Sequence, residues 1–186
     1  MTFFNVIQFL PPFTIHHFET LGSTNDTLKA MRDAAEFTCV TADEQTAGRG
    51  RAARSWYSEK GTGLYLSVLF CPGLSPEYLP VISLMTGVAV AEAIREIAPQ
   101  LADRIDIKWP NDLHISGRKT GGILCEGISG TDLKVIAGIG TNLNQENFPG
   151  ELDQLATSVF RETGRRIELE VYRNVLLERL AYWYDE

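Results

Sequence analysis

Four strand-like segments in the second half of the chain are joined by connections too short to contain a crossover helix. They span residues 105–109, 113–115, 121–127 and 133–140, with short polar stretches between them. Parallel neighbours need a connection of a dozen or more residues, so most of these strands should pair antiparallel. The pattern predicts an α+β fold with a mixed, largely antiparallel sheet flanked by helices, and not a regular βαβ alternation.

The remaining segments are predicted from hydrophobic periodicity and capping residues. Ser23 and Asp26 stand at capping-box spacing and open a helix that we expect to reach about residue 35. The last helix runs to the end of the chain, so Trp183 and Tyr184 should lack cover, as if the natural chain continued. Further strands are expected at 15–19, 37–42 and 64–70, and helices at 76–97, 151–155 and 171–184.

Composition predicts one soluble cytoplasmic domain. The 186 residues are 44% hydrophobic and 22% charged. The net charge of −7 argues against a general nucleic-acid or membrane-surface binder, and no run of 18 apolar residues suggests a transmembrane helix. The apolar segment 1–13 lacks the basic start of a signal peptide. Cys39, Cys71 and Cys125 show no metal-binding spacing, so reduced thiols are expected.

The segment 48–63 concentrates positive charge among glycines, with Arg49, Arg51, Arg54 and Lys60 in a chain that is acidic as a whole. Glycines let backbone N–H groups approach a ligand, and guanidinium groups suit phosphates and carboxylates. The segment therefore predicts an anion-binding loop. A dinucleotide fingerprint is disfavoured because neither a long helix nor a ribose-binding acid follows the glycines. A plain solvated loop remains an alternative.

Three later segments carry polar residues where predicted strands begin or end. Asn111 and Asp112 follow a strand, where they could hold a metal ion, orient a nucleophile or simply form a turn. Lys119 precedes two glycines in what alone reads as a hairpin turn, and the amides Asn142 and Asn144 end another strand. Each segment taken alone is typical of a turn.

Taken together and in order, these segments resemble the biotin protein ligase family over roughly residues 15–180. The matching segments are Ser23-Thr-Asn-Asp26, Gln45-Thr-Ala-Gly-Arg-Gly-Arg51, Trp56, Leu64-Tyr-Leu-Ser67, Lys108-Trp-Pro-Asn-Asp112, Arg118-Lys-x-Gly-Gly-Ile-Leu124 and Gly138-x-Gly-x-Asn-Leu-Asn144. The resemblance implies a class II aminoacyl-tRNA synthetase-like fold. It also implies a two-step reaction, in which biotin and MgATP give biotinyl-5′-AMP and a carrier-domain lysine then takes the biotin.

The resemblance also implies the residues of the site. Those expected to bind biotin are Ser23, Thr24, Asn25, Gln45, Gly48, Arg49, Gly50, Arg51, Tyr65, Ser67, Lys119, Gly122, Leu124 and Gly138. Those expected to contact ATP or the adenylate are Arg49, Arg51, Arg54, Trp56, Asn111, Lys119 and Asn142. Hydroxyls and amides suit the donors and acceptors of a ureido ring.

Three residues are expected to act in catalysis. Lys119 would bridge the biotin carboxylate and the α-phosphate, and Arg51 would help a loop close over both. Asp112 would bind or deprotonate the incoming lysine. Asn142 and Asp112 are also the expected contacts for Mg²⁺, which would accompany ATP.

The resemblance sets expectations about domains and partners. Residues 1–14 form an extension too short for the DNA-binding domain of bifunctional members, and residues 15–186 form the catalytic domain without the usual C-terminal SH3-like barrel. The expected partner is a biotin carboxyl carrier domain of a biotin-dependent carboxylase, not nucleic acid or membrane. Homodimer formation stays open. Lipoate-protein ligase and a non-catalytic biotin or biotinyl-AMP binding module are the alternatives.

Overall fold

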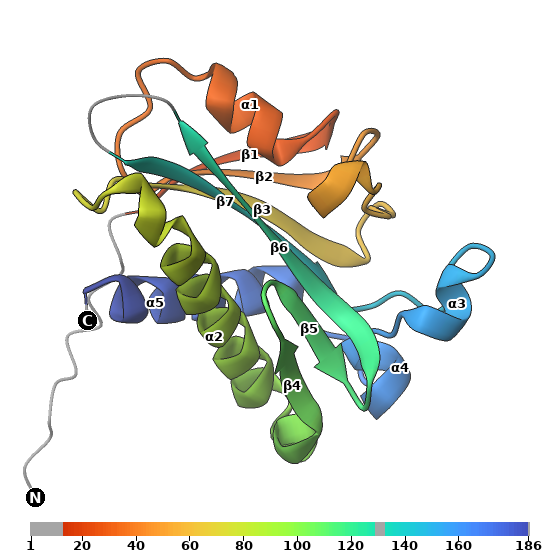
Figure 1. Cartoon of the computed structure of the whole chain (residues 1–186). Coiled ribbons are helices and arrows are strands. Elements are labelled where there is room, and N and C mark those ends of the chain that lie inside the picture. The colour runs from red at the N-terminus through yellow and green to blue at the C-terminus, as the bar shows by residue number, and fades with distance from the viewer. Residues whose placement is uncertain (1–12, 129–132, 186) are drawn as a thin grey trace, which may run out of the picture.

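A seven-stranded sheet organises the chain, seen in a computed structural model that describes residues 13–128 and 133–185 (Figure 1). The strand order is β1-β2-β3-β7-β6-β5-β4; β1 and β2 are parallel, and every other neighbouring pair is antiparallel. The predicted α+β class with a mixed, largely antiparallel sheet is confirmed. The elements are β1 (Thr14–Leu21), α1 (Thr24–Ala30), β2 (Thr38–Gln45), η1 (Arg51–Ala53), β3 (Gly63–Phe70), η2 (Pro76–Tyr78), α2 (Leu79–Ile97), η3 (Pro99–Arg104), β4 (Ile105–Lys108), β5 (Asp112–Ile115), β6 (Arg118–Ile128), β7 (Lys134–Asn142), α3 (Leu152–Leu155), α4 (Val159–Thr163) and α5 (Leu169–Asp185).

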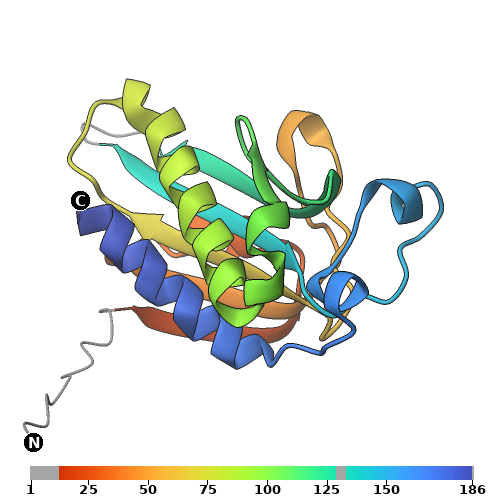
Figure 2. The ribbon, with the colours of Figure 1, turned by 90° about the horizontal axis from the view of Figure 1, so that it is seen from below.

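Helices cover both faces of the sheet. The long helices α2 and α5 lie side by side across one face, and α1 lies against the other (Figures 1 and 2). All eight residues of the interior strand β3 are therefore buried. Successive side chains point to opposite faces, so Leu66 and Val68 join the main core, whereas Ser67 meets the N-terminal turn of α1.

The helix formed by η2 and α2 is long and apolar enough to span a membrane by length and composition alone, with a mean hydropathy of 1.4 over its most apolar window. Half of that window is buried inside the protein. Ile94, Ala89 and Ala93 of this helix are fully buried in the core that the sheet and α5 complete. This packing is that of a core helix whose inner face the fold covers, while Val81 and Leu84 near its N-terminal end stay exposed.

Several predicted boundaries differ from the structure. The first helix ends at Ala30 and not near residue 35, because the chain leaves the helical conformation at Met31, where ψ is 85°. Farther on, Phe37 takes a positive φ of 63° and packs its ring against Phe13 and Phe70. The predicted turn at 116–119 is shorter, since β6 already begins at Arg118. Helix α4 was not predicted. Of the apolar segment 1–13, residues 1–12 lie outside the described residues.

The end of α5 is covered, which corrects the expectation that Trp183 and Tyr184 lack cover. The Tyr184 ring stacks on Phe70 with centroids 4.8 Å apart and meets the Phe37 ring edge-on at 5.3 Å. The Trp183 indole N–H donates to Glu92 at 3.0 Å. The helix end therefore closes the aromatic end of the core.

Removing the Tyr184 ring from this aromatic cluster should destabilise the fold. Tyr184→Ala removes a ring that packs on two others, so we expect the free energy of unfolding to fall by about 2–3 kcal/mol. Tyr182→Ala, at a residue 54% exposed on the same helix, should change it by less than about 0.5 kcal/mol. Urea unfolding followed by circular dichroism measures both. Equal losses in the two variants would contradict this account.

Candidate functional site

Two cavities meet at one end of the sheet, between the loop after β2 and the segment that carries α3. The larger has a volume of about 610 Å³ and the smaller about 50 Å³. The residues that line both cavities are Gly50, Arg51, Trp56, Asn111 and Lys119. All five were predicted site residues, so the chain brings its separate motifs to one junction.

A chain of hydrogen bonds lines the smaller cavity. Gln45 Oε1 accepts from the backbone N–H of Thr24 at 2.9 Å and from its hydroxyl at 3.1 Å. Gln45 Nε2 in turn donates to the Ser58 hydroxyl at 3.0 Å. These bonds fix which end of the Gln45 amide is the donor, and one Nε2 hydrogen is left over for a ligand.

Asn25 is held in one orientation at the base of the same cavity. Its Oδ1 lies 2.6 Å from the Ser67 hydroxyl, and its Nδ2 donates to the Leu124 carbonyl at 3.2 Å and to Glu126 at 2.6 Å. Ser67 also lies 2.8 Å from the Thr24 hydroxyl, and its single hydrogen serves only one of these acceptors at a time. The other acceptor is free to take a hydrogen from a ligand.

Two glycines make room for these side chains. A Cβ on Gly138 would lie 2.3 Å from Asn25 Oδ1, and a Cβ on Gly140 would lie 2.4 Å from Trp56 Cε2. Both glycines stand on β7 and face away from the main core. The flat strip of sheet they create carries the Trp56 indole, whose buried N–H has no hydrogen-bond partner among the described residues. An unpartnered buried donor of this kind is a ready contact for a ligand acceptor.

A β-bulge aims Lys119 into the junction. Leu113 pairs with Gly121 and His114 with Lys119, so Thr120 is an extra residue in β6. The extra residue reverses the alternation of faces, and the lysine points to the same side as Gly122. Its ammonium group donates to Asp112 at 2.7 Å and lies 5.4 Å from the Trp56 ring centroid. Strand β6, and not the predicted hairpin turn, therefore carries Lys119.

The arginines of the loop differ in their partners. Arg49 contacts Asp26 at 2.6 Å and Glu126 at 3.1 Å. Arg51 donates instead to the amide oxygen of Asn111 at 3.2 Å, and neither it nor Arg54 forms an ion pair within the described part of the chain. Arg51 and Arg54 both line the larger cavity. That cavity therefore presents positive charge that no carboxylate of the described chain neutralises.

The residues expected to contact Mg²⁺ both line the larger cavity. Asn142 is buried, donates to the Thr157 carbonyl at 3.1 Å and accepts from Gln145 at 3.4 Å. Asp112 holds Lys119. No group of three or more acidic, histidine or cysteine side chains is placed to hold a metal among the residues described. One carboxylate and one amide oxygen suit an ion that brings most of its ligands as phosphates and water, as Mg²⁺ does with nucleotides.

Comparisons with known proteins identify the family of the chain. Residues 18–144 match the biotin/lipoate A/B protein ligase family. The chain belongs to this family. It is 42% identical over 170 residues to the bifunctional ligase/repressor BirA of Bacillus subtilis, covering 88% of this chain and 51% of the relative. It is 36% identical to the biotin–[acetyl-CoA-carboxylase] ligase of Paracoccus denitrificans, covering 87% of this chain and 69% of that protein.

Among solved structures, the biotin protein ligase of Aquifex aeolicus in complex with biotin and ATP superposes with a TM-score of 0.80. Identity is 32%, and the match covers 92% of this chain and 70% of that one. The resemblance to biotin protein ligases found in the sequence is confirmed. The chain spans about half the length of the BirA relative, so the activity of the whole protein is treated as a proposal below.

Most of the residues that the ligase resemblance predicted lie at the cavities. Those lining the smaller one are Ser23, Thr24, Asn25, Gln45, Arg49, Gly50, Arg51, Trp56, Asn111, Lys119, Gly122, Leu124 and Gly138. Gly48 lies just outside, where a Cβ would be 2.7 Å from the Trp56 carbonyl. Tyr65 and Ser67 are fully buried behind the cavity wall. Burial raises the pKa of Tyr65, whose hydroxyl donates to the Glu59 carbonyl.

Sequence reasoning missed two groups of residues at this ligase-family site. Glu126 contacts both Asn25 and Arg49, and continuing the alternation from Gly122 and Leu124 along the strand would have indicated it. The apolar wall of the larger cavity comes from the loop after β2 and from the segment 148–156, which includes α3. Its residues are Tyr57, Phe148, Leu152, Leu155 and Ala156.

The contact between Trp56 and Gly140 can be tested without any ligand. Gly140→Ala places a methyl group where the indole lies, so Trp56 should move and become more accessible to acrylamide quenching. The measurement uses chains in which Trp109 and Trp183 are changed to Phe, so that only Trp56 emits. Gly22→Ala adds a methyl group in open space and is the control. Unchanged quenching in Gly140→Ala, with native circular dichroism, would contradict the packing described.

Proposed function

We propose that this chain is the catalytic unit of a biotin protein ligase, which makes biotinyl-5′-AMP from biotin and MgATP and then passes biotin to a lysine of a biotin carboxyl carrier domain. The observation that carries the proposal is the junction at Lys119. This cation faces a small polar cavity on one side and a large, partly apolar one on the other. Adenylation needs that arrangement, since a carboxylate from one ligand must meet a phosphate from another.

Biotin would enter the smaller cavity. The free Nε2 hydrogen of Gln45 and the acceptors on Thr24 and Asn25 suit the oxygen and N–H groups of a ureido ring. As it stands, a volume of about 50 Å³ holds no more than a few water molecules. Trp56 and the loop around Arg49 and Arg51 must therefore move before the bicyclic ring can enter. The glycines of this loop make such a movement possible.

ATP would occupy the larger cavity. Its base has the apolar wall formed by Phe148, Leu152 and Leu155, and its phosphates would meet Arg51 and Arg54. A biotin carboxylate oxygen attacks the α-phosphorus, a new P–O bond forms, and pyrophosphate leaves. Lys119 opposes the negative charge that builds on the phosphorus oxygens. Asp112 and Asn142 would help to hold Mg²⁺, which would supply further positive charge at the phosphates.

The second step would use Asp112. The carrier lysine attacks the carbonyl carbon of the mixed anhydride, a C–N bond forms, and AMP leaves. Asp112 faces the junction and can accept a hydrogen bond from the incoming ammonium group or take its proton. In the ligand-free chain this carboxylate is bound to Lys119, so the two steps draw on the same ion pair.

Two alternatives remain to be separated by experiment. The relatives described above are biotin ligases, which favours biotin over lipoate. A non-catalytic binding module would keep the smaller cavity and lose chemistry at Lys119. The decisive test is biotin- and ATP-dependent pyrophosphate release by the 186-residue chain, followed by transfer to a carrier domain. Release with lipoate in place of biotin, or biotin binding without release, would overturn the proposal.

Lys119→Ala tests the junction in the same assay. We expect pyrophosphate release to slow by about 10²-fold or more, because the cation that opposes the transition-state charge is lost. The fold should persist, since Lys119 is part-exposed and packs on one face of a ring. Lys134→Ala, at an exposed lysine on β7, is the matched control and should keep full activity. Undiminished release by Lys119→Ala would refute the role given to this residue.

A further inference from the structure

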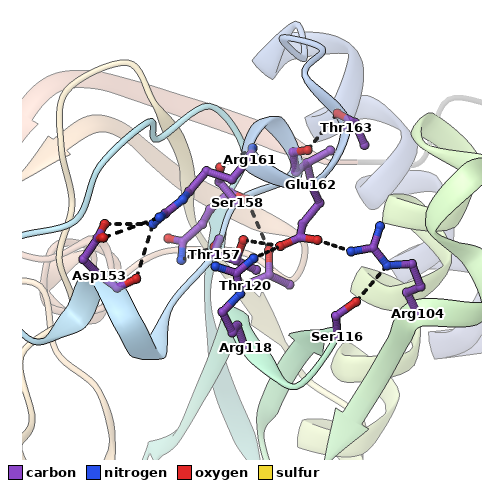
Figure 3. Close-up of polar contacts among 12 residues, drawn as sticks. Arg104, Ser116, Arg118, Thr120, Asp153, Thr157, Ser158, Arg161, Glu162 and Thr163 are labelled. Atoms are coloured by element: carbon purple, nitrogen blue, oxygen red, sulfur yellow. Dashed lines mark hydrogen bonds and ion pairs between the residues drawn. The ribbon is translucent and has the colours of Figure 1, made fainter.

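Glu162 is a buried carboxylate that lines neither cavity and has no part in the chemistry above. Its side chain is only 4% exposed, and it stands on the short helix α4. It pairs with the guanidinium groups of Arg104 and Arg118, one on each oxygen (Figure 3). A buried charge needs such partners, and replacing it leaves them unpaired. The contacts of Glu162 with the rest of the chain therefore indicate a structural role.

The carboxylate ties three parts of the chain together. Arg104 ends η3 and also donates to the Ser116 hydroxyl at 2.7 Å, in the turn between β5 and β6. Arg118 is the first residue of β6. The Thr157 hydroxyl donates to Glu162 at 2.7 Å from the segment before α4. Burial alone would raise the pKa of Glu162, but the Thr157 hydrogen bond and the two arginines outweigh it and hold this pKa below its usual range.

Thr157 carries the contact on to the site. Its backbone N–H donates to the Lys119 carbonyl at 2.9 Å, and its own carbonyl accepts from the Asn142 side chain at 3.1 Å. Ala156 also forms a parallel bridge with Lys119. Thr157 is fully buried. One residue therefore separates Glu162 from both Lys119 and Asn142.

The neighbouring side chain on α4 is anchored to the other wall. Arg161 donates to Asp153 at 2.8 Å, and the same carboxylate oxygen accepts from the Phe148 backbone at 3.1 Å. Phe148 forms part of the apolar wall of the larger cavity. Through the adjacent residues Arg161 and Glu162, helix α4 therefore contacts both α3 and β6, the strand that carries Lys119 (Figure 3).

We propose that Glu162 is a positioning residue: through Thr157 it sets where Lys119 and Asn142 stand at the junction of the two cavities. The proposal rests on the proposed function for its catalytic consequence. It adds a residue that touches no substrate. Misplacing a catalytic group by about 1 Å can cost about 10²-fold in rate, so loss of this hold should slow adenylation more than it weakens binding.

The test is Glu162→Gln in the full chain, which keeps the shape and removes the charge that holds both arginines. We expect kcat for biotin-dependent pyrophosphate release to fall about tenfold or more, with the Kd for biotin by calorimetry within about twofold of wild type. Hydrogen exchange at the Thr157 amide should speed up. In a Lys119→Ala background the same change should cost clearly less than in the wild-type chain, because only the contact through Asn142 then remains.

Two controls separate positioning from general stability. Leu180→Ala opens the core of α5 far from the site and should lower stability without changing kcat per folded molecule. Glu96→Gln breaks the exposed pair with Arg179 between α2 and α5 and should change neither. An unchanged kcat in Glu162→Gln, or an equal loss with and without Lys119, would overturn the proposal.

A failure of the proposed ligase function can be told apart from a failure of the proposal for Glu162. Wild-type chain that releases no pyrophosphate would refute the ligase activity, and the exchange measurement would still decide the structural hold. Faster exchange at Thr157 in Glu162→Gln, with the rest of the sheet protected, would support that hold. Exchange that matches wild type would overturn it.

Discussion

The site depends on the alternation of side chains along β3, β6 and β7, which gives the two faces of the sheet different chemistry. Leu66, Val68 and Ile139 point to the face that α2 and α5 cover. Ser67, Gly138 and Gly140 point to the other face, where the sheet is flat and partly polar. A shift in register by one residue would send serine into the apolar core and leucine into the cavity. The large core on one side therefore fixes the geometry of the small cavity on the other.

Part of the positive charge of the ligand-free site is neutralised by carboxylates of the chain itself. Lys119 is held by Asp112, and Arg49 by Asp26 and Glu126. An incoming carboxylate or phosphate must displace these partners. The free energy lost with the old ion pairs offsets part of the binding free energy that the new contacts provide. Among the described residues, the Arg51 guanidinium donates only to the amide oxygen of Asn111. Its charge is the least compensated at the junction, so it is the natural first contact for an anion, before the other pairs rearrange.

Sequence reasoning found the class of fold from local patterns, and it found most cavity residues from the resemblance that the ordered motifs carry. Short connections fixed the antiparallel pairing, and the motif segments brought Gln45, Arg51 and Lys119 to attention. What it missed depends on the whole fold. The bulge at Thr120 is a property of the pairing between β5 and β6, so neither strand alone indicates it. The positive φ of Phe37 goes with ring contacts to Phe70 and Tyr184, which join residues far apart in sequence.

The same reasoning explains why a helix of five residues can matter to a site it does not enter. Helix α4 is too short to be stable alone. Its place is set by the Ser158 cap, which also donates to the Gln145 carbonyl at 2.7 Å, and by charged contacts on both sides. Glu162 and Arg161 extend these contacts to the strand with Lys119 and to the loop with Phe148. The walls of the larger cavity come from segments far apart in the sequence, and no single strand carries both of them. A helix that contacts both walls, as α4 does, can therefore fix their relative positions.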